Sequence, residues 1–190
     1  MTSFARHAIP GIVEIVPQRH GDDRGFFSET YRQSEFEKQG IRIDWVQDNQ
    51  SISVNAGTIR GLHFQSPPLA QHKLVRVLRG AIYDVALDIR KGSPHFGDWV
   101  GVVISAAKWN QLLIPAGFAH GFMTIEPETE VLYKVSEYWS HEHEGTIRWD
   151  DPDLAISWPA LDSPPTLSGK DATAPLFRDV DSPFVFEGGQ

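Results

Sequence analysis

The chain contains no cysteine, and this absence removes several kinds of chemistry at once. Without thiols there can be no disulfide, no thiolate zinc or iron–sulfur site and no cysteine nucleophile. Basic side chains are also in the minority, since 17 Lys and Arg stand against 25 Asp and Glu and give a formal net charge of -8. Nucleic-acid binders and basic membrane-surface proteins need broad positive patches, so we expect neither nucleic acid nor a membrane as a partner.

Long apolar runs and targeting signals are missing as well. No apolar run approaches the roughly 18 residues that a membrane span requires, and the N-terminal MTSFARHAIPGIVEI lacks the charged-then-apolar order of a signal peptide. The glycine fingerprints of P-loop and dinucleotide-binding proteins are absent, as is the G-x-S-x-G elbow of serine hydrolases. We therefore expect a soluble, cytoplasmic protein whose 190 residues form a single domain.

Alternation of apolar and polar residues dominates the chain and predicts β-strands. Residues 81–90 are the clearest example, with Tyr83 and Val85 on one face and Asp84 and Asp88 on the other. Arg79-Gly80 precedes this run and predicts a tight connection. Further strands are predicted over residues 12–16, 26–31, 46–53, 58–64, 72–78, 99–105, 111–114, 119–124 and 130–137.

Helical patterns are scarce. One short helix is predicted over residues 34–39, with Ser34 as its cap and Gly40 after its end. The tail after Trp158 is rich in Pro, Ser and Asp and predicts loops with short helices. No repeat or composition break marks a second domain, so the fold class is all-β: a sandwich, jelly roll or barrel.

The densest group of ionisable residues lies between Arg60 and Lys73. Such residues are costly inside core strands unless they are paired or functional, although exposure of Arg60, His63 and Lys73 on one sheet face is an equally simple interpretation. Strict alternation would place Arg60 and His63 on opposite faces. A bulge at Gly61 could turn one of them towards the other.

A metal site is the weaker interpretation. Metal-binding cupins supply an H-x-H pair within a strand, whereas His63 is followed by Phe64 and Gln65. The H-x-H pair formed by His141 and His143 lies in a predicted polar turn, where such pairs are usually solvated. Metal-free acid–base chemistry remains, with His63 as base, Lys73 or Arg60 as the cation that holds negative charge, and an acid from another strand such as Tyr133.

Several long motifs, taken together and in order, resemble the dTDP-4-dehydrorhamnose 3,5-epimerase family. They cover nearly the whole chain: D-x-R-G-F-F-x-E at 22–29, Q-D-N-Q-S at 47–51, I-R-G-L-H-F-Q at 59–65, K-L-V-R-V-L-R-G at 73–80, I-P-x-G-F-A-H-G-F at 114–122, L-Y-K-V at 132–135, W-x-D-P-x-L-x-I-x-W-P at 149–159 and L-S-x-K-D-A at 167–172.

The resemblance implies a jelly-roll, cupin-like barrel without metal or other cofactor. It implies a homodimer whose N-terminal strands are exchanged with the partner, and an irregular tail over 160–190 that packs on the barrel. The implied reaction converts dTDP-4-dehydro-6-deoxy-D-glucose into dTDP-4-dehydro-L-rhamnose by inversion at C3 and C5.

The resemblance also implies roles for individual residues. His63 would be the base, oriented by Asp171, while Lys73 would stabilise the oxyanion at O4 and Tyr133 would return a proton from the opposite face of the ring. Arg24 and Glu29 would come from the partner chain. The substrate-binding positions implied in this way are Arg24, Phe27, Glu29, Gln47, Asp48, Asn49, Arg60, His120, Trp139, Glu144 and Lys170.

Three positions depart from the family pattern. Gly169 stands where many relatives have a charged residue, Trp139 replaces a common tyrosine, and Gln71-His72 replaces a frequent glycine. Two alternatives stay open: an epimerase that inverts only C3 or only C5, and a non-catalytic or metal-dependent cupin that binds a sugar or small acid. We expect Trp139 to stack on the thymine ring of the nucleotide.

Overall fold

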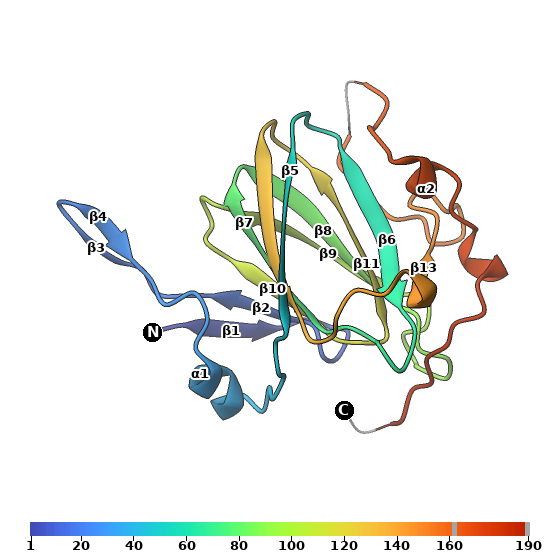
Figure 1. Cartoon of the computed structure of the whole chain (residues 1–190), viewed down its shortest axis with the longest axis horizontal. Coiled ribbons are helices and arrows are strands. Elements are labelled where there is room, and N and C mark those ends of the chain that lie inside the picture. The colour runs from blue at the N-terminus through green and yellow to red at the C-terminus, as the bar shows by residue number, and fades with distance from the viewer. Residues whose placement is uncertain (161–162, 189–190) are drawn as a thin grey trace.

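Two antiparallel sheets face each other and form most of the molecule (Figure 1). The computed structural model describes residues 1–160 and 163–188, so the tail predicted over 160–190 falls partly outside the described residues. The six-stranded sheet has the order β1 (Ser3–Arg6), β2 (Val13–Val16), β10 (Gln111–Ile114), β7 (Lys73–Arg79), β12 (Thr129–Val135) and β5 (Gln47–Ser53). The five-stranded sheet has the order β13 (Glu144–Thr146), β6 (Ile59–Gln65), β11 (Phe118–Thr124), β8 (Ala81–Asp88) and β9 (Trp99–Ser105).

The connection from β7 to β8 carries the chain from one sheet to the other through Gly80. Gly80 has φ +78°, and a Cβ at this position would lie 2.3 Å from Thr129 Oγ1. Only glycine fits such a turn without displacing its neighbour. The predicted tight connection is confirmed, and it joins two sheets instead of two strands of one hairpin.

The main apolar core fills the space between the two sheets. Val75 and Val77 on β7 pack there with Ile82 and Ala86 on β8. Leu87, from the opposite face of β8, belongs to a second core in which Phe184 of the C-terminal segment takes part. Both faces of β8 are therefore buried.

The predicted alternation in β8 is correct, but its polar face does not meet solvent. Asp84 and Asp88 are fully buried. Asp84 lies on the face of Ile82 and Ala86, which points into the space between the sheets. A carboxylate in that position has to be compensated by its surroundings.

Most strand predictions are confirmed, and residues 99–105 and 111–114 match β9 and β10 residue for residue. Residues 26–31 do not form one strand, because the glycine at position 25 permits a tight hairpin in which β4 (Gly25–Phe27) pairs with β3 (His20–Asp22). The helix α1 begins at Gln33 and ends at Lys38. Its N-cap is Arg32, so the predicted cap at Ser34 is wrong.

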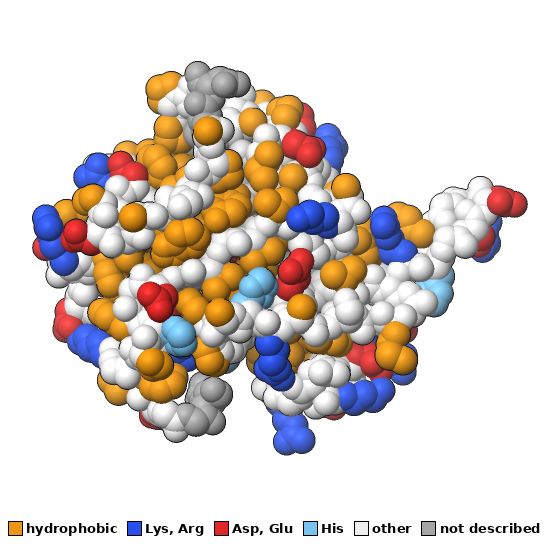
Figure 2. Space-filling view, turned by 180° about the vertical axis from the view of Figure 1, so that it is seen from behind, with side chains coloured by type: hydrophobic (Ala, Val, Ile, Leu, Met, Phe, Trp, Pro, Cys, Tyr) orange, Lys and Arg blue, Asp and Glu red, His pale blue; other side chains and the backbone are white. Residues whose placement is uncertain are grey.

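The β3–β4 hairpin projects from the body as a separate arm, which is visible from both sides of the molecule (Figures 1 and 2). Its side chains include Phe26 and Phe27, which are 54% and 67% exposed. The helices in the C-terminal part of the chain are short: α2 spans Gly169–Ala172, and a 3₁₀ helix spans Phe177–Asp179. Within residues 1–160 and 163–188, no helix is both long enough and apolar enough to cross a membrane.

Candidate active site

A cavity of about 440 Å³ lies between the two sheets, on the side where β5 and β6 face each other across the gap. Strands from both sheets and the short helix α2 supply its walls. The residues that line it are Ser51, Arg60, His63, Lys73, His120, Phe122, Tyr133, Ser168, Lys170 and Asp171. Polar side chains that are far apart in the sequence therefore line one cavity.

Arg60 and His63 reach the same cavity because β6 is irregular between them. His63 pairs with His120 of β11 and Arg60 pairs with Phe122, so two residues of β6 stand opposite one residue of β11. Gly61 has φ +134°, and a Cβ there would lie 2.4 Å from Gly121 Cα. The predicted bulge at Gly61 is confirmed, and it requires glycine because the two backbones touch.

His63 is held by a buried carboxylate from another part of the chain. Its Nε2 lies 2.6 Å from Asp171 Oδ1, and Asp171 is only 3% exposed. The second carboxylate oxygen accepts a hydrogen bond of 2.9 Å from the Ser168 hydroxyl, which is also the N-cap of α2. Burial raises the pKa of Asp171, but the hydrogen bond from His63 and the neighbouring charges outweigh it and lower the pKa overall. Asp171 therefore stays ionised and fixes the ring of His63.

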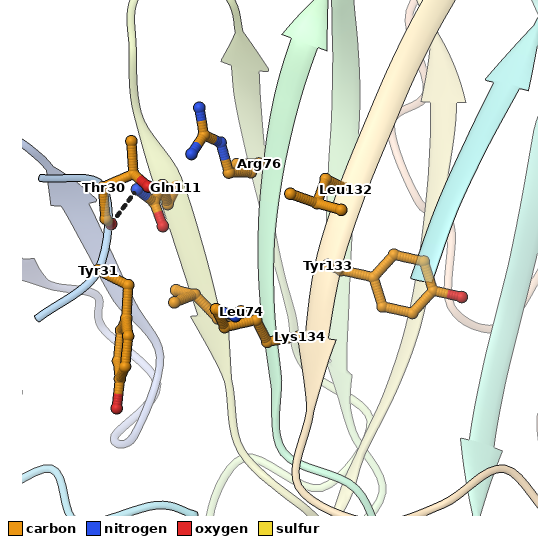
Figure 3. Close-up of a pocket in the computed structure, with 8 residues that line it drawn as sticks. All are labelled: Thr30, Tyr31, Leu74, Arg76, Gln111, Leu132, Tyr133 and Lys134. Carbon is orange, nitrogen blue, oxygen red and sulfur yellow. Dashed lines mark hydrogen bonds between the residues drawn. The ribbon is translucent and has the colours of Figure 1, made fainter. Parts of the chain in front are cut away.

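Tyr133 approaches from the opposite sheet. It lies on β12 and packs against the core between the sheets. Figure 3 shows its ring pointing away from Leu132, which lies on the outer face of the same strand. Burial raises the pKa of Tyr133, although the charge of Arg60 and an interaction with Asn49 oppose the shift. The phenol therefore stays protonated at neutral pH and can donate a proton.

Lys73 is a buried cation without a direct partner in the described part of the chain. It is 8% exposed at the start of β7, and no described residue forms an ion pair with its ammonium group. Burial lowers its pKa from 10.5 to about 8, and the charges of Asp84 and Glu144 limit the decrease. A buried ammonium that faces a cavity is ready to stabilise negative charge on a bound molecule.

Other predicted residues surround these groups. The Arg60 guanidinium donates to the Ile52 carbonyl at 3.2 Å, which directs it along β5. The Lys170 ammonium donates to Glu144 Oε1 at 2.7 Å across the cavity rim. His120 is buried on β11, and its Nε2 lies 2.9 Å from an oxygen of Asp84.

A smaller space of about 140 Å³ adjoins the cavity and is lined by Asn49, Trp139 and Glu144, among others. The Trp139 backbone N–H donates to Gln47 Oε1 at 3.3 Å, and the Gln47 side-chain amide donates to Asn49 Oδ1 at 2.8 Å. The indole is 58% exposed. These residues form the outer part of the site.

Four predicted binding residues lie outside the cavity of their own chain. Asp48 points to the outer face of β5, where it accepts a hydrogen bond of 3.0 Å from Lys134. The period of two along a strand sends the Asp48 side chain away from the cavity of its own chain, and its contact with substrate stays a prediction. The other three lie on or just after the projecting hairpin: Arg24, Phe27 and Glu29.

Sequence reasoning missed three residues of the cavity wall, Ser51, Phe122 and Ser168, and also Asp84, which contacts His120. The alternation of β8 placed Asp84 on the face opposite Tyr83, and only the topology shows that this face is internal. The metal alternative finds no ligand set, since the described residues contain no group of three His, Asp or Glu placed to hold an ion. His143 instead has its Nδ1 2.9 Å from the Ser140 hydroxyl.

Comparison with known proteins agrees with this geometry. The family model of dTDP-4-dehydrorhamnose 3,5-epimerase matches residues 6–179. The chain belongs to the dTDP-4-dehydrorhamnose 3,5-epimerase family. A curated epimerase of this name from Salmonella typhimurium is 51% identical over 177 residues, which cover 93% of this chain and 96% of the relative. The resemblance seen in the sequence is confirmed, and the chain is an isomerase.

Solved structures of the family have the same fold. The dTDP-4-dehydrorhamnose 3,5-epimerase of Bacillus anthracis, solved with TDP and PPi bound, superposes with a TM-score of 0.89 at 48% identity, covering 93% of this chain and 99% of that one. The dTDP-6-deoxy-D-glucose-3,5-epimerase of Legionella pneumophila, in complex with dTDP-4-keto-L-rhamnose, gives 0.91 at 43% identity and covers 95% of each chain. The predicted all-β, jelly-roll fold is confirmed.

Proposed function

We propose that this epimerase converts dTDP-4-dehydro-6-deoxy-D-glucose into dTDP-4-dehydro-L-rhamnose by inverting C3 and C5. One observation carries the proposal: the His63–Asp171 pair and the Tyr133 phenol enter one cavity from different sheets, and the same cavity holds the Lys73 ammonium, which is ion-paired with none of the described residues. Epimerisation needs a base on one face of the sugar and an acid on the other. The name of the curated Salmonella relative and the dTDP-4-keto-L-rhamnose bound in the Legionella structure support this substrate class.

The first step is removal of a proton next to the ketone. C3 and C5 are both bonded to the C4 carbonyl carbon, so their protons are acidic and their loss gives an enolate. In our proposal His63 takes the proton, and the electron pair of the broken C–H bond moves towards C4 while O4 becomes negative. Lys73 stabilises this charge in a site where little water competes. Asp171 stabilises the imidazolium that results.

The second step returns a proton from the other face. Tyr133 gives its phenolic proton to the carbanionic carbon, the C4 carbonyl is restored, and the configuration at that carbon is inverted. His63 then releases its proton and the phenolate regains one, so the protein is unchanged overall. The same pair of residues serves C3 and C5 in turn, because one base can reach both carbons from one ring face.

The rim of the cavity suits the rest of the substrate. Arg60 and Lys170 are cations at the wall, and His120 adds a ring nitrogen. Such groups bind sugar hydroxyls and the diphosphate. Gln47, Asn49 and Glu144 lie further out, towards Trp139.

Proton NMR of the substrate with the enzyme in D2O tests the proposal. We expect the signals of both H3 and H5 to disappear and the L-configured product to form. Exchange at a single carbon would instead assign the chain to the single-position epimerases. If neither proton exchanges and the nucleotide sugar still binds, the chain is a binding protein and the proposed activity is wrong.

We further propose that the enzyme is a homodimer in which the β3–β4 hairpin of one chain reaches the site of the other. Arg24, Phe27 and Glu29 belong to this arm or directly follow it, and the arm points away from its own body (Figure 1). Two exposed phenylalanines on a projecting hairpin favour a covering partner. In the single chain, β1 and β2 pair with its own β10, so the exchange of these strands stays a prediction.

Complementation between two inactive variants tests this arrangement. His63→Ala and Arg24→Ala should each be nearly inactive alone, because one lacks the base and the other the arm. Mixed after dissociation, they should recover about a quarter of wild-type activity, since half of the dimers are mixed and each has one intact site. If each site used its own arm, every chain in the mixture would still carry a defect and no activity would return.

Trp139→Ala tests the proposed stacking on thymine. A base stacked on an aromatic ring contributes about 1–3 kcal/mol, so we expect dTDP to bind about 5- to 150-fold more weakly. Turnover of saturating substrate should change less, because the reacting carbons lie deeper. Isothermal titration calorimetry with dTDP measures the effect, and Trp139→Phe, which keeps a ring, should lose less affinity. Equal affinity in all three proteins would assign the indole to packing.

A further inference from the structure

Asp84 is a carboxylate in the middle of the apolar core. It is 0% exposed on β8, with Ile82 and Ala86 beside it on the same face. One oxygen lies 2.9 Å from His120 Nε2, whereas the other has no hydrogen-bond partner among the described residues. Buried polar atoms are nearly always paired, so an unpaired carboxylate oxygen needs an explanation.

The His120 ring does not cancel the charge of Asp84. Burial lowers the pKa of His120, and the charges of Lys73 and His63 lower it further, against the opposing effect of Asp84. His120 is therefore neutral at pH 7 and donates its Nε2 proton to the carboxylate.

Lys73 lines the same cavity as His120, the hydrogen-bond partner of Asp84, and comes from the opposite sheet. Asp84 is the strongest of the groups that favour the ammonium form of Lys73. The other charged groups that act on Lys73 are Glu144 on β13, which also favours the ammonium, and Lys170 on α2, which disfavours it. Glu144 is already engaged by Lys170 at 2.7 Å, while the free oxygen of Asp84 has no competing partner in the described chain.

We propose that Asp84 is a positioning residue that keeps Lys73 cationic inside the core, with His120 holding the carboxylate in place. An apolar side chain would fill this position of β8 at lower cost, because a buried charge is expensive and a buried ion pair adds little to stability. The free-energy cost of burying the Asp84 carboxylate is explained if its charge serves the reaction. The inference rests on the role proposed for Lys73, and it adds a residue that acts through Lys73 without touching the substrate.

Asp84→Asn tests the inference because it keeps the size of the side chain and an oxygen that can accept from His120. Loss of one nearby opposite charge should lower the pKa of Lys73 by about one to two units. The alkaline limb of the pH profile of kcat/KM should move down by the same amount, so activity at pH 8 should fall about 5- to 50-fold. NMR titration of 13C-labelled lysine, with Lys73→Met to identify the signal, measures the pKa without any substrate. This readout is independent of whether the proposed reaction is correct.

Asp88→Asn is the matched control. Asp88 is a second fully buried carboxylate on β8, but it is bound by Arg90 and Ser93 and lies outside the cavity. The Asp88→Asn substitution should lower thermal stability and leave the Lys73 titration and the alkaline limb of the pH profile unchanged. Asp84→Ser removes the charge at position 84 with a different change in packing and should shift the titration in the same direction as Asp84→Asn. An unchanged Lys73 titration in either folded variant, or failure of both to fold, would overturn the proposal in favour of a structural role.

Discussion

His63→Ala is expected to stop the exchange of both α-protons with solvent deuterium. The imidazole is the group that Asp171 holds in the cavity, at 2.6 Å from its carboxylate, and one base serves both carbons in the proposed mechanism. Loss of a general base usually lowers the rate by about 10²–10⁴-fold. NMR in D2O at saturating substrate follows C3 and C5 separately, so the loss should be seen at both positions.

Two further variants make this result specific. Tyr133→Phe should still allow proton removal while it blocks formation of the L-configured product, because it removes the acid and leaves the base. His95→Ala removes a histidine that pairs with Asp98 outside the cavity and should behave as wild type. Exchange at the wild-type rate at either carbon in His63→Ala would remove His63 from the role of base.

Lys73→Met is expected to lower kcat by about 10²–10³-fold, the usual effect of removing one group that stabilises an oxyanion. Methionine fills a similar volume in the core, so the variant should fold. Lys134→Met is the matched control: this lysine lies on the outer face of the same sheet, next in sequence to Tyr133, and pairs with Asp48. If both variants were equally active, the charge of Lys73 would have no part in the reaction.

The buried environment of Lys73 also predicts the pH dependence. Its pKa is about 8 in the folded protein against an ordinary value of 10.5, and in the proposed mechanism the charged form is the active one. Activity should therefore fall tenfold per pH unit above about pH 8. Between pH 8 and 10.5 the unfolded chain binds more protons at this lysine than the folded chain, so its contribution to the free energy of unfolding rises with pH. A fall in activity without a parallel fall in stability distinguishes this titration from alkaline denaturation.

The strands could be predicted from the sequence because alternation is a local signal. Residues 99–105 alternate in the linear chain just as they do in β9. It was harder to predict which face of a strand meets solvent, because a strand buried on both sides has the same period as one with an exposed face. Tyr83 and Asp84 illustrate this limit: both point into packed layers, and only the order of strands in the sheet determines which layer is which.

The motifs led to residues that lie together in the fold. The cavity is lined by His63, Lys73, Tyr133 and Asp171, and their catalytic roles stay predictions. The bulge at Gly61 was accessible from the residues alone, since strict alternation contradicted the expected pairing. The outward direction of Asp48 was not apparent, because a contiguous motif does not reveal that alternate residues of β5 point in opposite directions. Asp84 was missed because its hydrogen-bond partner His120 comes from β11, 36 residues further along the chain.

The proposed acid and the proposed base belong to different sheets, and this has a consequence for the apolar residues that separate them. Tyr133 moves with β12, whereas His63 moves with β6, and no short loop ties these two strands directly. The gap across which a proton must be delivered is set by side chains such as Val131 and Phe122, which pack in the layer between the sheets. A shift of about 1 Å in reacting groups can cost as much as 10²-fold in rate. The hydrophobic core of this enzyme is therefore a spacer as well as a source of stability. Its packing sets the distance between the proposed proton donor on β12 and the proposed proton acceptor on β6.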